Sequence, residues 1–329
     1  MRKILVTGGT GFIGSHLSEA LAKKGYKVRV FDRYNPNYNL GNLTNSKYKS
    51  KIDFLFGDIR DYDSVFKAVK NCDIIFHLAA LIGIPYSYHS PSAYIKTNIE
   101  GTYNILEAAK NLKTKKIFIT SSSEVYGSAK YLPIDEEHPL QPQSPYSASK
   151  ISADNLSISY FNSFDLPVNI LRPFNTYGPR QSQRAIIPTL IKQILKIKKK
   201  KGKISVGNIH PKREFNFVDD VCAAFLKAMK LKKYGQIINI GNGYDISIKQ
   251  LINILSLIMN KKVEIEISKE RKRPKKSEVK RLLSSTKKIK KLLNWKPKYS
   301  KHKGLIAGLK KTIEWNIKSD NIFAKKYIL

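Results

Sequence analysis

Tyr146 and Lys150 stand four residues apart, a spacing that places two side chains on one face of a helix. A phenol ordinarily loses its proton at about pH 10, and a cation held beside it favours the phenolate. We therefore expect Lys150 to lower the pKa of Tyr146, so that the phenol can act as a base near neutral pH. The same spacing is common on amphipathic helix surfaces, so the neighbouring motifs decide between these two interpretations.

A run of hydroxyl residues with one acid precedes this pair: Ser121, Ser122, Ser123 and Glu124. The run follows the apolar residues 116–119, which predict a buried strand. The polar side chains therefore stand at the carboxyl end of a strand, where open α/β sheets bind their ligands.

A glycine-rich turn near the N-terminus predicts a dinucleotide site. It follows the β-rich residues 3–7 and holds Gly8, Gly11, Phe12, Ile13 and Gly14, before a helical pattern that runs through Lys24. Glycines permit a tight turn and let a pyrophosphate rest at the helix N-terminus. Asp32 ends the next strand, where a carboxylate accepts hydrogen bonds from ribose hydroxyls and repels a 2′-phosphate. NAD is therefore favoured, and Arg33 leaves NADP as the alternative.

Strands and helices alternate along the first half of the chain. This alternation predicts an α/β fold, a doubly wound parallel sheet of the Rossmann kind. The expected strands are residues 3–7, 27–31, 52–56, 73–78, 116–119, 167–171 and 237–240, and the expected helices besides the Tyr146 helix include 61–70, 93–111, 185–198, 247–260, 286–293 and 303–317.

The segments after the fourth strand favour ligand contact. Leu78, Ala79 and Ala80 follow that strand, and small residues there let a cofactor pass close to the backbone. His77 is expected to be a packed strand-end histidine, because no second metal-type residue is spaced with it. Residues 82–94 are rich in Tyr and Pro and predict an irregular, substrate-facing loop that contains Tyr86.

Composition narrows the class of protein. Two cysteines, Cys72 and Cys222, make neither a disulfide framework nor a metal set, which favours a reducing cytoplasm. We expect no secretory signal and no membrane insertion, because no apolar run is long enough. Residues 1–150 hold 20 Lys and Arg against 13 Asp and Glu, and residues 151–329 hold 40 against 12. Lysine runs such as 196–203 can bind polyanions, but no nucleic-acid module accompanies them, so a solvated lysine surface is the prediction.

Eight motifs, taken in order, resemble the extended short-chain dehydrogenase/reductase family that acts on nucleotide-diphosphate sugars with NAD. They are TGGTGFIGSHL, GDIRD, HLAA, SSEVYG, YSASK, RPFNTYGPR, REFNFVDD and RKRPKKSEV. Within the family, LIGIPYSYHSP and PIDEEHPLQPQSPYSASK look most like bacterial nucleotide-hexosamine 4,6-dehydratases of the legionaminic-acid pathway.

The resemblance implies a division of labour along the chain. Residues 1–174, with 214–243 returning to them, would form the NAD-binding domain. Residues 175–213 and 244–329 would form a smaller lobe that binds the nucleotide sugar, and a homodimer is expected. By resemblance the cofactor also contacts Asp58 and Ile59, the catalytic set is Ser122, Ser123, Glu124, Tyr146 and Lys150, and the substrate contacts are Tyr86, Asn175, Arg180, Arg213 and Arg273.

Glu124 favours a dehydratase over its relatives. A 4-epimerase needs a hydroxyl, the Tyr and the Lys, whereas a dehydratase must also remove the C5 proton and expel the C6 hydroxyl. A positioned carboxylate can do this. The family's glucose dehydratases carry Asp-Glu where this chain has Ser123-Glu124, so the general acid is either Glu124 or a water held by Ser123. UDP-glucuronate decarboxylation and 4-epimerisation remain as alternative activities. A third alternative, from a different class of function, is a cofactor-binding regulator that associates with nucleic acid.

Overall fold

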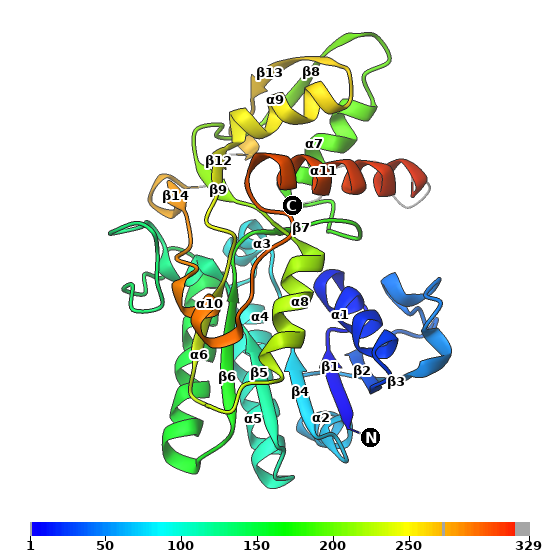
Figure 1. Ribbon diagram of the computed structural model, residues 1–329, viewed down its shortest axis with the longest axis vertical. Helices are drawn as coiled ribbons and strands as arrows, with labels where there is room; N and C mark the ends of the chain where they lie inside the picture. The colour runs from blue at the N-terminus through cyan, green and yellow to red at the C-terminus, as the bar shows by residue number, and fades with distance from the viewer. Residues whose placement is uncertain (1, 272–273, 320–329) are drawn as a thin grey trace.

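The computed structural model describes residues 2–271 and 274–319. Its centre is a parallel sheet of seven strands in the order β11-β6-β5-β4-β1-β2-β3 (Figure 1). The strands are β1 (Lys3–Thr7), β2 (Lys27–Arg33), β3 (Ile52–Gly57), β4 (Ile74–His77), β5 (Lys116–Thr120), β6 (Val168–Pro173) and β11 (Ile237–Ile240). The strand order reverses between β1 and β4, which is where sheets of this kind open a ligand crevice. The predicted doubly wound α/β fold is confirmed.

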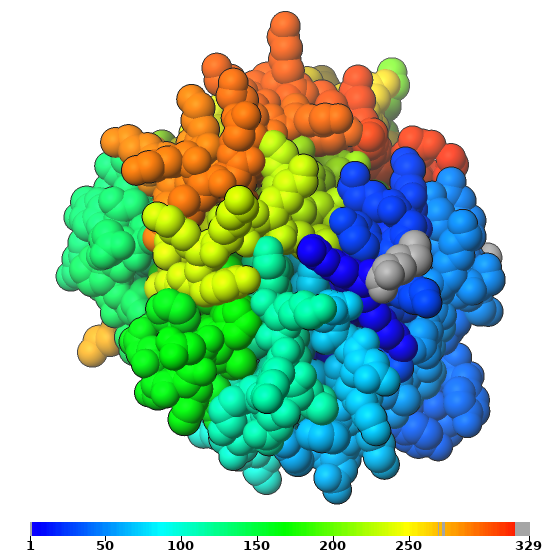
Figure 2. Space-filling model, turned by 60° about the horizontal axis from the view of Figure 1, so that its bottom comes forward, coloured from blue at the N-terminus to red at the C-terminus, as the bar shows by residue number. Residues whose placement is uncertain are grey.

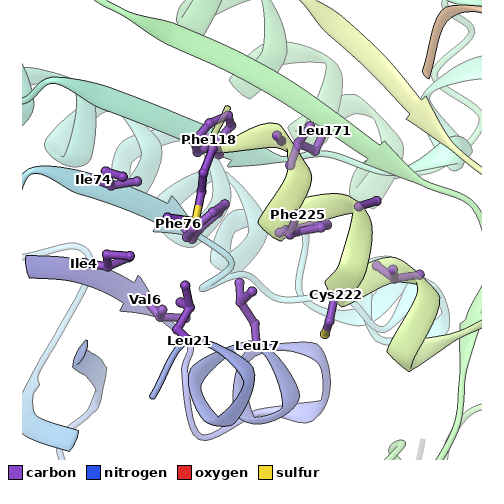
Figure 3. Packing of buried hydrophobic residues seen from close by; sticks show 14 of the residues in the cluster. Ile4, Val6, Leu17, Leu21, Ile74, Phe76, Phe118, Leu171, Cys222 and Phe225 are labelled. Carbon is purple, nitrogen blue, oxygen red and sulfur yellow. The ribbon is translucent and has the colours of Figure 1, made fainter. Parts of the chain in front are cut away.

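Alternation of side chains along β1 builds a core on each face of the sheet. Ile4 and Val6 point to one face, against α1 (Phe12–Lys23) and α8 (Val218–Ala228), as Figure 3 shows. Leu5 points to the other face, which is covered by helices that complete the second layer. These are α2 (Tyr62–Val69), α5 (Gly101–Asn111) and α6 (Pro145–Phe164).

Aromatic packing joins the late helix α8 to the early strands. The ring of Phe76 on β4 stacks on Phe118 of β5 at 4.9 Å between centroids, and it lies 5.9 Å from the ring of Phe225 on α8 (Figure 3). Burying a phenylalanine side chain stabilises the fold by about 1.5–3 kcal/mol. Figure 2 shows the result from another side, with the segment around α10 (Lys287–Leu293) lying beside the α8 region. The last third of the chain thus packs back onto the N-terminal sheet.

A second lobe has its own core. It is built on α7 (Ile186–Leu195), α9 (Ile248–Ile258), α11 (Lys301–Lys318) and the parallel pair β8 (Lys201–Val206) and β13 (Lys262–Ile267). Short strands link it to the main sheet: β7 (Thr176–Tyr177) pairs with β10 (Asn216–Phe217), and β9 (Lys212–Glu214) pairs with β12 (Asp245–Ser247) and β14 (Arg281–Leu282). The domain boundaries given above stay a prediction.

Two segments differ from the sequence-based expectation. Residues 82–94 are not irregular: they form α3 (Ile84–His89) and α4 (Pro91–Tyr94), because Pro85 and Pro91 each start a helix without needing an N–H partner. No strand is among those expected above at the lysine run of residues 196–203, but the end of this run forms β8. There Lys201 and Lys203 pair with Glu264 and Glu266 across to β13, while the lysines just before stay exposed.

Within the described residues, no helix is both long and apolar enough to cross a bilayer. The same residues contain no group of three or more His, Cys, Asp or Glu that could hold a metal ion.

Candidate functional site

Two adjoining pockets, each of about 690 Å³, open at the carboxyl edge of the main sheet. We call the first the glycine-turn pocket, because Gly8, Gly11 and Gly14 line it. The second, the lobe pocket, extends under the second lobe and is lined there by Arg213. Tyr146 lines both pockets, so they form one continuous cleft.

Every residue predicted to bind the cofactor lines the glycine-turn pocket. They are Gly8, Gly11, Phe12, Ile13, Gly14, Asp32, Arg33, Asp58, Ile59, Leu78, Ala79, Ala80, Tyr146 and Lys150. Thr10 and Arg60 line it as well, and sequence reasoning missed them. Arg60 forms an ion pair with Asp58. Because the two residues are only two apart in the sequence, this spacing could have indicated that Arg60 lies at the same pocket as Asp58.

The glycine turn leaves room for a dinucleotide. Gly8 has φ +66°, a conformation that favours glycine, and a Cβ there would lie 2.9 Å from the backbone nitrogen of Ala79. A Cβ at Gly14 would overlap the carbonyl oxygen of Gly8. Asp32 is held in place by Thr10, whose N–H and hydroxyl donate to Oδ2 at 2.9 and 2.6 Å. Bare backbone at a helix N-terminus, with a fixed carboxylate beyond it, suits a pyrophosphate and a ribose.

His77 lies beneath this pocket as a packed residue, as expected. Its Nδ1 is 2.8 Å from the Thr7 hydroxyl and its Nε2 is 3.2 Å from the Thr102 hydroxyl. Thr7 accepts from the N–H groups of Leu78 and Ala79, and Thr102 donates to the carbonyl of Asn98. The hydrogen bonds are satisfied if Thr7 donates to Nδ1 and Nε2 carries the proton. Burial lowers the pKa of His77 to about 3, and the charge of Lys150 acts in the same direction, so the ring is neutral.

The helix α6 places Tyr146 and Lys150. It starts at a capping box between Ser144 and Ser147, with Pro145 in the first turn, so Tyr146 lies at the helix N-terminus facing the cleft. The Lys150 ammonium donates to the carbonyl oxygen of Thr120 at 2.6 Å. Burial lowers the pKa of Lys150 to about 8, and the charge of Asp154 opposes that change.

The predicted effect of Lys150 on the pKa of Tyr146 stays a prediction, because burial dominates in the protein chain alone. Burial raises the pKa of Tyr146 above its ordinary value, a hydrogen bond with Ser122 opposes that rise, and the charge of Glu124 adds to it. The Lys150 ammonium is itself hydrogen-bonded to the Thr120 carbonyl. A phenolate at Tyr146 therefore needs a further positive charge in the cleft.

The segment after β5 brings the hydroxyl run and the acid together with Tyr146. Ser123–Tyr126 forms one short helical turn, and the Ser122 hydroxyl accepts from the Glu124 N–H at 3.2 Å. Ser122 lines both pockets, Ser123 lines the glycine-turn pocket and Glu124 lines the lobe pocket. Glu124 and Tyr146 thus line the same pocket, and the charge of Glu124 raises the pKa of Tyr146.

Some of the predicted substrate contacts line the pockets and others do not. Tyr86 and Asn175 line both pockets, and Arg213 lines the lobe pocket, where its Nη2 donates to the Val279 carbonyl at 2.6 Å. Arg180 lines neither pocket, since its guanidinium pairs with Glu19 of α1 at 2.9 Å. Arg273 lies outside the described residues.

Two other arginines line the lobe pocket: Arg184 and Arg271. Arg184 lies four residues after Arg180 and Arg271 two residues before Arg273, but neither was among the substrate contacts expected from the resemblance. Which arginine side chain points into the pocket depends on how each segment folds.

Comparison with known proteins places the chain among nucleotide-sugar enzymes. The family model described as GDP-mannose 4,6 dehydratase matches residues 5–307. Human dTDP-D-glucose 4,6-dehydratase is 32% identical over 95% of this chain and 89% of its own length. The UDP-glucuronate 4-epimerase of Thermodesulfobacterium geofontis is 33% identical over 95% of both.

A solved structure agrees with both the fold and the cofactor prediction. DesIV, the dTDP-glucose 4,6-dehydratase of Streptomyces venezuelae with NAD and TYD bound, has a TM-score of 0.86 and 28% identity, and the match covers 97% of this chain and 98% of that one. NAD in this relative is what Asp32 predicted for the present chain. The chain belongs to the extended short-chain dehydrogenase/reductase family of nucleotide-sugar 4,6-dehydratases and 4-epimerases.

Proposed function

We propose that the protein is an NAD-dependent nucleotide-sugar 4,6-dehydratase whose substrate is UDP- or GDP-N-acetylglucosamine, of the type used in legionaminic-acid biosynthesis for cell-surface polysaccharides. One observation carries the choice of dehydratase: Glu124 lines the lobe pocket together with Ser122 and Tyr146, close enough for its charge to raise the pKa of the Tyr146 phenol. The relatives include both dehydratases and epimerases, and a second base beside the phenol is useful to a dehydratase but not to a 4-epimerase. A UDP-glucuronate decarboxylase shares the SEVYG motif, and the loop of residues 133–150 favours the dehydratase over it. The sugar is proposed from the resemblance of residues 81–91 and 133–150.

NAD would be held by the glycine turn and Asp32, and Lys150 would bind its ribose. When bound, NAD supplies a hydride acceptor for C4 and the positive nicotinamide charge that Tyr146 lacks in the protein chain alone. Tyr146 then takes the proton of the 4-hydroxyl, and Ser122 hydrogen-bonds the oxygen at C4.

Glu124 carries the step that separates the two activities. The ketone at C4 acidifies the proton at C5, and the Glu124 carboxylate removes it. Water leaves from C6, with its proton supplied by Glu124 or by a water that Ser123 holds. The hydride taken from C4 would then return to C6 and a proton would return to C5, which completes the 4-keto-6-deoxy sugar with no net oxidation. Acid–base participation of this kind contributes about 10²–10⁴-fold to a rate.

The arginines of the lobe pocket suit the diphosphate of the substrate. Arg213 contributes from β9, Arg184 from the segment before α7, and Arg271 from the short 3-10 helix Lys269–Arg271. Guanidinium groups bind phosphate oxygens in pairs, which orients the sugar as well as holding it. Asn175 and Tyr86, which line both pockets, would lie beside the sugar itself.

We also propose a homodimer in the cytoplasm, where nucleotide sugars are made. Ile95, Tyr103 and Phe164 lie on the helical layer formed by residues 95–111 and α6, and each is about half exposed, at 51%, 46% and 52%. A second copy would cover them. Light scattering on wild type and on Tyr103→Lys measures whether a dimer forms through this layer.

Product analysis tests the proposed function. UDP-GlcNAc, GDP-GlcNAc, dTDP-glucose and UDP-glucuronate are offered in parallel, and the products are read by NMR. A 4-keto-6-deoxy sugar from one of the hexosamine nucleotides is expected. An inverted C4 hydroxyl would assign a 4-epimerase, and carbon dioxide from UDP-glucuronate would assign a decarboxylase.

The variant Glu124→Gln tests the role of the carboxylate. It should lower dehydration by about 10²–10⁴-fold while cofactor reduction stays detectable, because C4 oxidation does not need the second base. Full dehydratase turnover in this variant would remove Glu124 from the mechanism.

A further inference from the structure

A buried ion pair lies behind the cleft without lining either pocket. Arg172 of β6 donates through Nε to Oδ2 of Asp154 on α6 at 3.0 Å, and each residue is 1% exposed. Arginine keeps its proton in proteins, and a neutral Asp154 would leave that buried cation unpaired. Asp154 is therefore a carboxylate, even though burial raises its pKa, with Arg172 opposing that rise.

Asp154 holds the first end of the catalytic segment, residues 121–126. The same Oδ2 that receives Arg172 also accepts the Ser121 hydroxyl at 2.6 Å. Ser121 directly precedes Ser122, the hydroxyl that lines both pockets. The position of the segment at this end is thus set by the carboxylate of Asp154.

Arg172 holds the other end of the same segment. Its Nη1 donates to the Tyr126 hydroxyl at 2.9 Å, and its guanidinium lies 5.1 Å from the centre of the Tyr126 ring. The Tyr126 hydroxyl in turn donates to Oδ1 of Asn239 on β11 at 2.7 Å. Glu124 lies between the two anchored ends, so a shift of the ion pair would move its carboxylate.

Asp154 also acts on Lys150, one helical turn earlier on α6. The groups that act on Lys150 are Asp154 of its own helix, the Thr120 carbonyl of β5 and the neutral His77 of β4, and Tyr146 lies one turn earlier on α6. Of these, Asp154 is the anion that opposes the loss of the Lys150 proton. The ion pair therefore acts on the Glu124 segment through hydrogen bonds and on Lys150 through charge.

We propose that Asp154 and Arg172 are positioning residues for the reaction: they fix the Glu124 segment from both ends, and Asp154 holds a negative charge one helical turn from Lys150. The inference about Glu124 rests on the proposed function, whereas the inference about Lys150 holds for any member of the family that oxidises C4. The pair touches neither substrate nor cofactor pocket, so its effect is transmitted through Ser121, Tyr126 and Lys150.

The first test is Asp154→Asn, which keeps the size and the acceptor for Ser121 but removes the charge. The rate of cofactor reduction in a single turnover is measured from pH 6 to about pH 10. Loss of the carboxylate lowers the pKa of Lys150, so the alkaline limb of the profile should move to lower pH by about one unit or more. Asp154→Glu keeps the charge and should retain the wild-type limb. An unmoved limb in Asp154→Asn overturns this half of the proposal.

Asp165→Asn is the matched control. Asp165 is exposed at the end of the same helix in the left-handed conformation, which asparagine also adopts. It removes the same charge from α6 without touching the buried pair, so its profile should match wild type. A shift as large as that of Asp154→Asn would show a general charge effect and overturn the assignment to Asp154.

The second test keeps both charges and loosens the segment. Tyr126→Phe removes the hydroxyl that joins Arg172 to Asn239, and Tyr126 lines neither pocket. It should lower elimination at least about tenfold, with KM and the rate of cofactor reduction within about twofold of wild type. Equal loss of both steps, or no loss, overturns the positioning of Glu124. This test decides the matter even if Asp154→Asn does not fold.

Failure of the proposed function would be visible separately. If wild-type product is a C4 epimer, the dehydratase assignment fails, and the pH profile of cofactor reduction still tests Asp154. If wild type makes the 4-keto-6-deoxy sugar while the variants behave as wild type, the dehydratase stands and the positioning pair is wrong.

Discussion

The ring of Tyr94 lies edge-on against the ring of Tyr146, with centroids 6.2 Å apart and planes at 81°. Tyr94 is buried and its hydroxyl donates to the carbonyl of Gly83. The reactive phenol is thus held on one side by a second tyrosine from α4, a helix that starts at Pro91. Edge-to-face pairs of this kind are worth about 0.5–1.5 kcal/mol.

Replacing Tyr94 should therefore change catalysis more than folding. Tyr94→Leu loses the edge contact and should lower kcat by about three- to tenfold, because the Tyr146 ring gains freedom. Tyr94→Phe keeps the ring and should stay within about twofold of wild type. Steady-state kinetics with circular dichroism as the folding check measures both. A Leu variant with wild-type kcat would show that the contact does not position the phenol.

The buried, neutral His77 should make the free energy of unfolding depend on pH. Its folded pKa of about 3 is below the value of about 6.5 in the unfolded chain, so the unfolded chain binds the extra proton between these values. The free energy of unfolding therefore contains a term that is fully present above pH 6.5 and is lost as pH falls, by about 1.4 kcal/mol per pH unit.

His77→Gln removes this term. Urea unfolding at several pH values between about 4.5 and 6.5 should give a shallower loss of stability in the variant than in wild type. His302→Gln is the control, since His302 is exposed, and it should keep the wild-type slope. An identical slope in His77→Gln would mean that this ring is not held neutral.

Asp32 should govern the choice of cofactor. Asp32→Ser removes a charged acceptor for ribose hydroxyls, and hydrogen bonds to charged groups are worth about 1.5–3 kcal/mol. The Kd for NAD should rise about ten- to 150-fold and the preference over NADP should shrink. Calorimetric titration of cofactor-free protein measures both. Asp53→Asn, on β3 outside both pockets, should leave NAD binding as in wild type.

Gly14 lies so close to the Gly8 carbonyl that we expect no larger residue to fit at this position. In Gly14→Ala the new methyl would overlap the Gly8 carbonyl, and backbone on both sides has to move. We expect a loss of at least about 2 kcal/mol of unfolding free energy together with weaker NAD binding. Gly83→Ala is the matched control, because its nearest neighbours would be 3.6 Å away. Equal stability of the two variants would contradict the packing described for the glycine turn.

Local patterns were enough to predict the sheet and most of the cofactor pocket. The glycine turn with Asp32, and the helix of Tyr146 and Lys150, each lie within one strand–turn–helix unit, so sequence spacing fixes their geometry. The two helices at residues 84–94 were missed, although Pro85 and Pro91 signal helix starts, because the Tyr- and Pro-rich composition resembles a loop.

The sequence by itself determined that a dinucleotide turn, a Tyr–Lys pair and an acid after β5 would meet at one sheet edge, since carboxyl ends of parallel strands share that edge. Only the tertiary structure decided which arginines reach the cleft, Arg184 and Arg271 rather than Arg180, which pairs with Glu19. It also decided that Asp154 meets Arg172. Such contacts join segments far apart in the chain, and their energy depends on packing and desolvation that no local spacing encodes.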